Sequence, residues 1–459
     1  MHYGKEVNMD NRYSDVDKSI CLNAWYGNDA KKIMEVLCKE IGPRPTAGES
    51  IKKARGYLTG ELNRSGINKV WEEEMPAPLW IPEAASIEVM SSENRRYDCI
   101  QNLFSVSGEV EGSLLDLGTC DEKTLREKGS RAKGSVILLE GMATYGGKYS
   151  PMGERLNDLL YLEPAAIILR SMKRSIKSAY INAISVEKDF PVPCVSISPE
   201  VEENLMNDLK KGAVRVRVKT KAKRKESVCS NLIADIKASN NTDEMVILGA
   251  HLDSFWISPG AGDDLTGVVT VMEIARLLYP FRDRFKRNLR IVLFTGEELY
   301  YIGSKNYIKA HREELDSVRF VFTLDNLYTS TARGAAVIWT PEIRDYIDEM
   351  FKDMGVEMEV REMFCMSSDY LPFILEGVPA GRQSNFYDPV PSASHTVMDD
   401  LENIHIDWIQ HNAMVFARMM ARFLMDVGPI PGKRLAKEKV YGLIEDDARK
   451  SLIYEGFDI

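Results

Sequence analysis

The feature that most constrains the fold is an alternation of apolar runs and helical patterns in the second half of the chain. Residues 245–252 (MVILGAHL) form an apolar run without polar alternation, residues 267–279 have helical spacing, and residues 288–295 form a second apolar run. The same order recurs over residues 304–315 and 319–327. Strands that are apolar on both faces need a layer of helices on each side. We therefore expect an α/β fold, a three-layer sandwich around a mixed, mostly parallel sheet.

The first region, residues 1–75, predicts two helices and a strand. Residues 29–38 have helical spacing, and the GPRPTAGES segment at residues 42–50 interrupts it as a turn. Thr46 or Ser50 stands where a side chain could cap the second helix. We expect this region to belong to the same domain as the strand–helix pattern that comes later.

The remainder of the chain divides into three further regions. Residues 76–225 carry short β-rich runs separated by turns, which predict an inserted domain because helical periodicity resumes only after them. The last part of this region, residues 210–225, is a basic run that we interpret as a solvated edge strand protected by its charge. The strand–helix pattern occupies residues 226–430, and residues 431–459 form a C-terminal extension.

Composition and charge argue against several classes of function. Of the 459 residues, 44% are hydrophobic and 28% charged, which is enough apolar material for a core that needs no disulfides. The net charge of −10 argues against a nucleic-acid binder, and no apolar run is long enough for a membrane span. The seven cysteines are scattered without a CxxC pair, and the first residues lack the apolar stretch of a signal peptide. We therefore expect a cytoplasmic chain that binds neither nucleic acid nor membrane.

Acidic residues and one histidine stand at the ends of three of the apolar runs. These residues are His251, Asp253, Glu297, Glu298 and Asp325. Because strand ends meet at one edge of an α/β sheet, we expect these side chains to lie close together. Buried carboxylates that crowd one another repel unless a cation compensates their charge. The sequence therefore predicts a metal site at this edge.

Three further residues complete this constellation. Asp263 and Asp264 precede a predicted helix, and His395 lies much later in the chain. Taken singly, each has an ordinary explanation, such as a pair of capping carboxylates. Taken together, imidazoles and carboxylates without cysteine suit Zn²⁺, Co²⁺ or Mn²⁺. Two such ions about 3.5–4 Å apart, bridged by one carboxylate, would leave Glu297 as a general base. We assign the other four histidines to structure or surface: His2, His311, His405 and His411.

The ordered motifs resemble the co-catalytic zinc exopeptidases, which include bacterial leucyl aminopeptidases and plasma glutamate carboxypeptidase. The matching stretches are, in chain order, GPRPTAGES, GAHLDS, PGAGDDLTG, FTGEELYYIGS, TLDN, SSDYLPFILEGVPA and HTVMDD, within about residues 42–424. The resemblance implies a metallopeptidase with two zinc ions per chain that hydrolyses terminal peptide bonds of a peptide substrate. Residues 76–225 resemble the protease-associated domain of several members, which implies a wall of the cleft or a homodimer contact.

The resemblance also implies a role for each matching residue. His251 and Asp325 are expected to bind one metal ion. Glu298 and His395 are expected to bind the other. Asp263 is then the carboxylate that bridges the two ions.

Two further carboxylates match catalytic positions of the family. Glu297 matches the general base, and Asp253 matches the carboxylate that orients the imidazole two residues before it. Asp264 stands where family members often have a cis peptide bond. Tyr370 replaces a frequent histidine and Asp400 a frequent threonine, so the chain departs from the family where substrate recognition is concerned.

Two alternatives remain open at this level. A glutaminyl cyclase shares the fold but keeps one zinc ion, and relatives of the transferrin receptor are non-catalytic scaffolds that have lost ligands. All five ligand positions and the base are filled here, which favours the peptidase. The choice among aminopeptidase, dipeptidase and carboxypeptidase stays open, as do the side-chain preference, the native metal and a homodimer.

Overall fold

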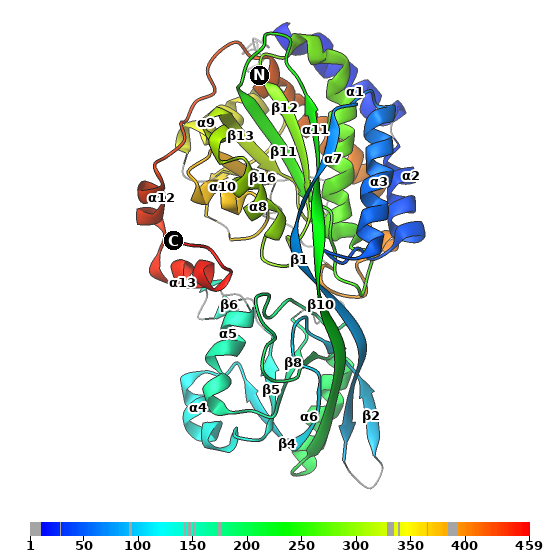
Figure 1. Cartoon of the computed structure of the whole chain (residues 1–459), viewed down its shortest axis with the longest axis vertical. Coiled ribbons are helices and arrows are strands. Elements are labelled where there is room, and N and C mark those ends of the chain that lie inside the picture. Colours follow the sequence, from blue (N-terminus) through cyan, green and yellow to red (C-terminus); the bar gives the residue numbers. More distant parts are fainter. Residues whose placement is uncertain are drawn as a thin grey trace, which may run out of the picture.

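The structure is a computed structural model of the whole chain. It describes residues 11–27, 29–90, 94–141, 144–145, 148–149, 152–172, 177–327, 335–337, 340–364, 366–383 and 393–459. These residues form an upper and a lower part that two long strands connect (Figure 1). The six cysteines within the described ranges are free. No helix of the described residues combines the length and apolarity that a membrane crossing requires.

Strands β1 (Val70–Val89) and β10 (Arg215–Ile236) form one antiparallel ribbon that runs through both parts (Figure 1). At its upper end β10 also pairs with β12 (Asn288–Phe294), and at its lower end with β4 (Gly108–Gly118). The prediction of a solvated edge strand for the basic run is therefore wrong at its lower end. Buried and exposed residues alternate there, because one face of the antiparallel sheet is covered and the other meets water.

The upper sheet is mixed and mostly parallel. Strand β11 (Met245–His251) lies between β12 and β13 (Val318–Thr323) and runs parallel to both. Strand β16 (Ala380–Gln383) continues this parallel order beside β13. Strand β14 (Ala335–Val337) pairs antiparallel with β16 and parallel with β15 (Val360–Glu362). The prediction of an α/β fold with a mixed, mostly parallel sheet is confirmed.

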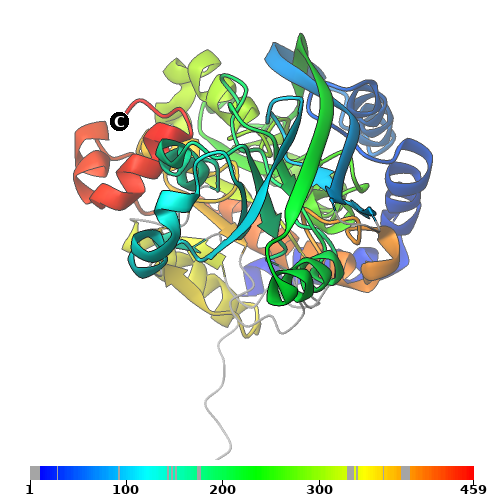
Figure 2. The same ribbon diagram turned by 90° about the horizontal axis from the view of Figure 1, so that it is seen from below.

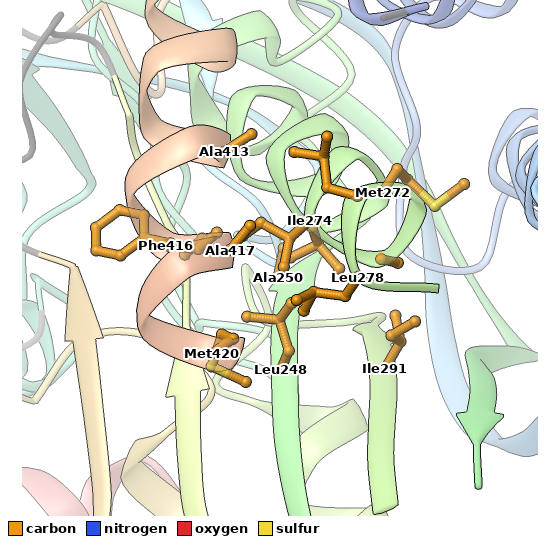
Figure 3. Close-up of a cluster of buried hydrophobic side chains, with 14 of the residues drawn as sticks. Leu248, Ala250, Met272, Ile274, Leu278, Ile291, Ala413, Phe416, Ala417 and Met420 are labelled. Carbon is orange, nitrogen blue, oxygen red and sulfur yellow. The ribbon is translucent and has the colours of Figure 1, made fainter. Parts of the chain in front are cut away.

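Helices α7 (Thr266–Leu278) and α11 (Ile406–Met425) cover one face of this sheet. Figure 3 shows Leu248 and Ala250 of β11 beside Ile274 of α7 and beside Ala417 and Met420 of α11. Successive residues of a strand point to opposite faces, so Ile247 packs on the other side. Replacing the fully buried Phe416 by alanine would cost about 3–5 kcal/mol of stability.

The opposite face is covered by α8 (Ile302–Ala310) and α10 (Leu371–Leu375). Tyr307 of α8 and Phe373 of α10 are buried against Ile247 and its neighbours. Helices therefore cover both faces of the upper sheet. This explains why its strands are apolar runs without alternation.

The N-terminal helices α1 (Ser14–Tyr26) and α2 (Ala30–Glu35) pack beside α7 and α11 (Figure 1). The next helix, α3 (Glu49–Arg64), begins after Gly48, and no side chain caps it. The prediction that Thr46 or Ser50 caps this helix is therefore wrong. The two hydroxyl groups bond elsewhere, because the turn that precedes α3 folds back onto the strand ends.

The chain between the two strands of the ribbon forms the lower part, whose sheet extends from β10 through β4. Strands β5 (Val136–Glu140), β8 (Ala166–Arg170) and β9 (Cys194–Ser196) extend the sheet from β4 in parallel order. Helix α6 (Pro199–Lys211) packs on one face of these strands and α5 (Met152–Asp158) on the other. Both predicted limits of the insert fall within the ribbon, because one pair of strands serves both parts.

The C-terminal extension contains α12 (Lys437–Leu443) and α13 (Asp446–Tyr454). These helices lie beside the upper end of the lower part, as the red segment in Figures 1 and 2 shows. Ser451 Oγ donates to Glu154 Oε2 at 2.7 Å, and Tyr454 Oη donates to the Ile184 carbonyl at 2.7 Å. The extension therefore bonds directly to the lower part.

Candidate metal centre

Asp263 lies between two histidines that come from distant parts of the sequence. His251 ends β11, and its Nε2 lies 3.0 Å from Asp263 Oδ1. His395 follows α10 and β16, and its Nε2 lies 3.4 Å from Asp263 Oδ2. Each oxygen of the carboxylate therefore faces a different imidazole. A carboxylate that bridges two metal ions needs this arrangement.

The two other predicted acidic ligands complete one group on each side of Asp263. Glu298 Oε2 lies 3.2 Å from His395 Nε2, and Asp325 Oδ1 lies 3.9 Å from His251 Nε2. The potential ligand atoms of His251, Asp264 and Asp325 lie within 4.8 Å of one another, and so do those of Asp263, Glu298 and His395. The structure thus brings all five sequence-predicted ligands together at the carboxyl edge of the sheet.

Asp264 also lies beside His251, but its oxygens are already used as acceptors. Its Oδ1 accepts from the backbone N–H groups of Gly267 at 3.0 Å and Asn326 at 3.1 Å. Its Oδ2 accepts from the His251 N–H at 3.3 Å. Asp264 therefore ties two strand ends to the start of α7, and the Asp263–Asp264 peptide bond is cis. We assign it a structural role, although it falls in the same ligand group.

The ionisation of the cluster reflects crowded charges in a buried place. Burial raises the pKa of Glu298 to about 7 and that of Glu297 well above its usual value. Burial opposes ionisation of Asp263 as well, but hydrogen bonds from His251 and His395 hold its pKa below the usual range. Three carboxylates and two imidazoles with so little exposure need a compensating cation. The donor set of nitrogen and oxygen atoms without sulfur fits zinc or a similar ion.

Asp253 lies behind His251 and links three segments. Its Oδ2 accepts from Thr46 Oγ1 at 3.0 Å, and its Oδ1 accepts from the Glu297 N–H at 3.3 Å. The Nδ1 atom of His251 is 3.2 Å from the Asp253 backbone carbonyl and 3.7 Å from the carboxylate. The backbone carbonyl is therefore the nearer acceptor for the imidazole, while the carboxylate holds the Glu297 backbone and the turn at Thr46.

Glu297 and Asp263 are each held through backbone groups. Glu297 Oε1 accepts from the Ser368 N–H at 3.1 Å, which orients the carboxylate beside the ligand cluster. The two oxygens of Asp399 accept from the N–H groups of Gly262 at 2.7 Å and Asp263 at 3.2 Å. Asp399 was not among the residues predicted from the sequence. Its place in the HTVMDD motif, four residues after His395, is the signal that could have found it.

His395 is held from the lower part of the molecule. Its Nδ1 lies 3.1 Å from the carbonyl of Ile181, and the Tyr180 ring stacks on it with centroids 5.1 Å apart and an angle of 13°. Phe255 meets the same imidazole edge-on at 4.7 Å. The region at residues 76–225 therefore completes the site, and no sequence pattern pointed to Tyr180 or Ile181.

A cleft opens at this cluster, between the upper part, the lower part and the C-terminal extension. Besides the ligand residues, its lining includes Tyr180, Asn182, Tyr300, Ser367, Arg382 and Glu455.

Three of the four remaining histidines lie among the described residues. His311 pairs with Glu73 at 2.9 Å, and the His405 ring lies tilted against that of Trp408 with centroids 4.3 Å apart. His411 is half-buried on α11, and His2 lies outside the described residues.

The α/β sheet with two imidazoles and three carboxylates at its carboxyl edge is typical of hydrolases with two adjacent metal ions. Residues 231–420 match Peptidase family M28, and this segment contains every predicted ligand and the predicted base. Over these residues the chain is therefore similar to the M28 peptidases, which are hydrolases.

Curated relatives of the chain are exopeptidases by name. Carboxypeptidase Q of Xenopus laevis is 26% identical over 349 residues, which cover 74% of each chain. A probable leucine aminopeptidase 2 of Aspergillus oryzae is 23% identical over 423 residues, which cover 84% of this chain and 81% of the relative.

Solved structures share the fold. The crystal structure of a peptidase M28 precursor from Shewanella amazonensis gives a TM-score of 0.81 at 20% identity, covering 92% of this chain and 99% of the other. A zinc aminopeptidase from Bacillus subtilis gives a TM-score of 0.66 at 20% identity, covering 86% and 94%. The architecture of the upper and lower parts together is therefore one that other proteins also have.

Proposed function

We propose that the chain is a zinc-dependent exopeptidase that holds two metal ions and hydrolyses terminal peptide bonds of short peptides. The observation that carries this proposal is the position of Asp263, whose two oxygens face the imidazoles of His251 and His395. The names of the relatives, a carboxypeptidase and a leucine aminopeptidase, support the restriction to chain ends. The zinc of the Bacillus subtilis enzyme supports the metal.

The ligands of the first ion would be His251, Asp263 and Asp325, and those of the second Asp263, Glu298 and His395. When bound, the two ions supply Lewis-acid chemistry, since they acidify water and polarise the scissile carbonyl. The chain's own residues then have defined tasks. The Ser368 N–H keeps the Glu297 carboxylate oriented beside this cluster.

Glu297 is the proposed general base. It takes a proton from the attacking water and returns it to the nitrogen of the departing residue. Burial raises its pKa, which makes the carboxylate a stronger proton acceptor than an exposed glutamate. Asp253 holds the Glu297 backbone in place and fixes the turn at Thr46, so it acts as a positioning residue.

The lower part forms one wall of the proposed active site. We propose that residues 76–225 are an insert of the protease-associated type whose Tyr180 and Ile181 orient His395. A homodimer and a cytoplasmic location also stay predictions, which light scattering and cell fractionation would test.

The test is an activity panel with the metal content under control. The apoprotein is loaded with Zn²⁺, Co²⁺ or Mn²⁺ and assayed with dipeptides, aminoacyl-anilides and N-blocked peptides. We expect hydrolysis of at least one class with free chain ends, at two metal ions per chain. One zinc ion with cyclisation of N-terminal glutamine would favour a glutaminyl cyclase. Two bound ions with no hydrolysis of any peptide would contradict the proposal.

A further inference from the structure

Glu455 of the C-terminal extension stands in the cleft of the candidate metal centre. It follows α13 directly and lines the cleft together with Glu297 and Glu298. The match to the peptidase family ends at residue 420, so this carboxylate belongs to a part of the chain outside the matched segment. The extension therefore adds a carboxylate of its own to the cleft.

The carboxylate of Glu455 is buried and lacks a hydrogen-bond partner. The residue is 3% exposed, and within the described part of the chain its Oε2 atom accepts no hydrogen bond. Such a carboxylate is unfavourable, because burial removes its water without a replacement. Burial accordingly raises the pKa of Glu455 to about 8. A cation that enters the cleft would supply the missing partner and favour the ionised form.

Lys305 of α8 does not provide this partner. Its ammonium group donates to the backbone carbonyl of Glu455 and lies over the Phe457 ring, 4.0 Å from the centroid. Among the described residues, Lys305 lines a neighbouring hollow with Glu187 and is not part of the cleft wall. Its charge lowers the pKa of Glu455 less than burial raises it, and Glu154 raises it further.

Aromatic contacts on both sides of Glu455 hold the residue in place. The Tyr454 ring meets the Tyr300 ring edge-on with centroids 6.2 Å apart. The Phe457 ring lies against the Tyr301 ring with centroids 6.0 Å apart. Because Glu455 lies between Tyr454 and Phe457 in the chain, its position is fixed before a ligand arrives. A group that is already fixed loses little freedom on binding.

The same two tyrosines separate Glu455 from the reacting bond. The Tyr301 N–H donates to the Glu297 carbonyl at 3.1 Å, so one turn of the chain separates the proposed base from the ring that faces the extension. Glu455 lies beyond that ring, whereas the α-ammonium group of a substrate stands beside the scissile bond. The cation that reaches Glu455 is therefore carried by a side chain. Lysine and arginine carry their charge at the end of a long apolar stem.

The cleft also offers apolar contacts for such a stem. Met152 and Met172 of the lower part line the same cleft as Glu455. Both pack on the hydrophobic cluster of the lower part. Methionine side chains are apolar and adaptable, so they can follow a chain of methylene groups. An apolar wall together with a buried carboxylate matches a basic side chain.

We propose that Glu455 binds the charged end of a lysine or arginine side chain next to the scissile bond, so that the chain prefers basic residues there. This inference rests on the proposed peptidase function and deepens it, because it names the substrate class. A charge-assisted hydrogen bond to a carboxylate that otherwise has no partner should favour such a residue about 10- to 100-fold in kcat/KM.

The experiment compares lysine with norleucine, which has the same stem without the ammonium group. Lys-Ala, Ala-Lys and the two corresponding norleucine dipeptides are substrates of the zinc-loaded full chain. At least one lysine dipeptide should exceed its norleucine counterpart about 10-fold or more in kcat/KM. In Glu455→Gln this ratio should fall toward one. Glu438→Gln, which removes an exposed carboxylate of α12 in the same extension, should keep the wild-type ratio.

Equal wild-type rates on the lysine and norleucine dipeptides would overturn the proposal, whether or not the variants fold. If Glu455 were purely structural or bound the α-ammonium group, Glu455→Gln would lower both rates together. The ratio would then stay at its wild-type value, which would also overturn the proposal. Absence of hydrolysis of every peptide would contradict the proposed function itself, so the two failures are distinguishable.

Discussion

Ile181 and His395 exchange two hydrogen bonds across the boundary between the lower and upper parts. The Ile181 N–H donates to the His395 carbonyl at 3.0 Å, and His395 Nδ1 lies 3.1 Å from the Ile181 carbonyl. With Nδ1–H as the donor, Nε2 keeps its lone pair directed at Asp263 and Glu298. The lower part therefore sets the tautomer and the orientation of one proposed ligand.

Tyr180 supports the same imidazole by stacking, so its ring should matter more than its hydroxyl. We expect Tyr180→Ala to weaken binding of the second metal ion about 10-fold, because partners of a ligating histidine typically contribute 10- to 100-fold. Tyr180→Phe should bind both ions nearly as the wild type does. Competition titration with a zinc chelator measures both. Tyr161→Ala, at an exposed tyrosine of the lower part, is the control. Unchanged affinity in Tyr180→Ala would show that the Tyr180 ring does not support His395 as a ligand.

Glu297 should be required for turnover but not for metal binding. Glu297→Gln keeps an oxygen for the Ser368 N–H but cannot accept a proton, so kcat should fall about 10²- to 10⁴-fold. Elemental analysis should still find two ions per chain. Turnover within a factor of about three of the wild type would rule out Glu297 as the base.

Asp399 and Asp400 offer a matched pair of neighbouring carboxylates. Asp399 is buried and accepts from the Asp263 N–H, whereas Asp400 is exposed and accepts from the Leu401 N–H at 2.6 Å. Asp399→Asn should lower metal affinity about 10-fold, because an amide offers one acceptor oxygen for two N–H groups. Asp400→Asn should leave the affinity unchanged. Equal effects of the two substitutions would show that Asp399 does not position the bridging carboxylate.

The pair formed by His311 and Glu73 should make stability depend on pH. Burial works against the charge on both groups, but their mutual hydrogen bond raises the pKa of His311 and lowers that of Glu73. A raised histidine pKa stabilises the fold at pH values below the unfolded pKa of about 6.5 and loses this effect as pH rises through the folded pKa. The lowered Glu73 pKa stabilises above about pH 4.3 and loses its effect as pH falls.

His311→Gln should therefore cost about 1 kcal/mol of unfolding free energy near pH 5.5 and less near pH 9, as measured by denaturant unfolding at both pH values. His411 provides the opposite case, since burial lowers its pKa. His411→Gln should raise the unfolding free energy at pH 5.5, because protonation of the half-buried His411 costs free energy in the folded state. A loss in His311→Gln that is equal at both pH values would contradict the ion pair.

The site residues at the strand ends could be predicted from the sequence, because each of them follows its strand directly in the chain. The runs that became β11, β12 and β13 are mostly apolar, and each leads into a ligand or the base within a few residues. Parallel neighbours in one sheet then place His251, Glu298 and Asp325 at one edge. This part of the site follows from the pattern alone.

Contacts between distant segments could not be read in this way. Thr46 looked like a helix cap, but its hydroxyl bonds to Asp253, 207 residues away. The basic run looked like an edge strand because its charges alternate, whereas β4 covers its other side. Tyr180 and Ile181 carry no local signal at all, since their role depends on how the lower part docks against His395.

The central claim is that two cations bind on either side of Asp263. Anomalous diffraction at the zinc edge, from crystals of the zinc-loaded chain, measures this directly. The account predicts two peaks about 3.5–4 Å apart, one near His251 and Asp325 and one near Glu298 and His395. A single peak, or no peak between the two histidines, would contradict it.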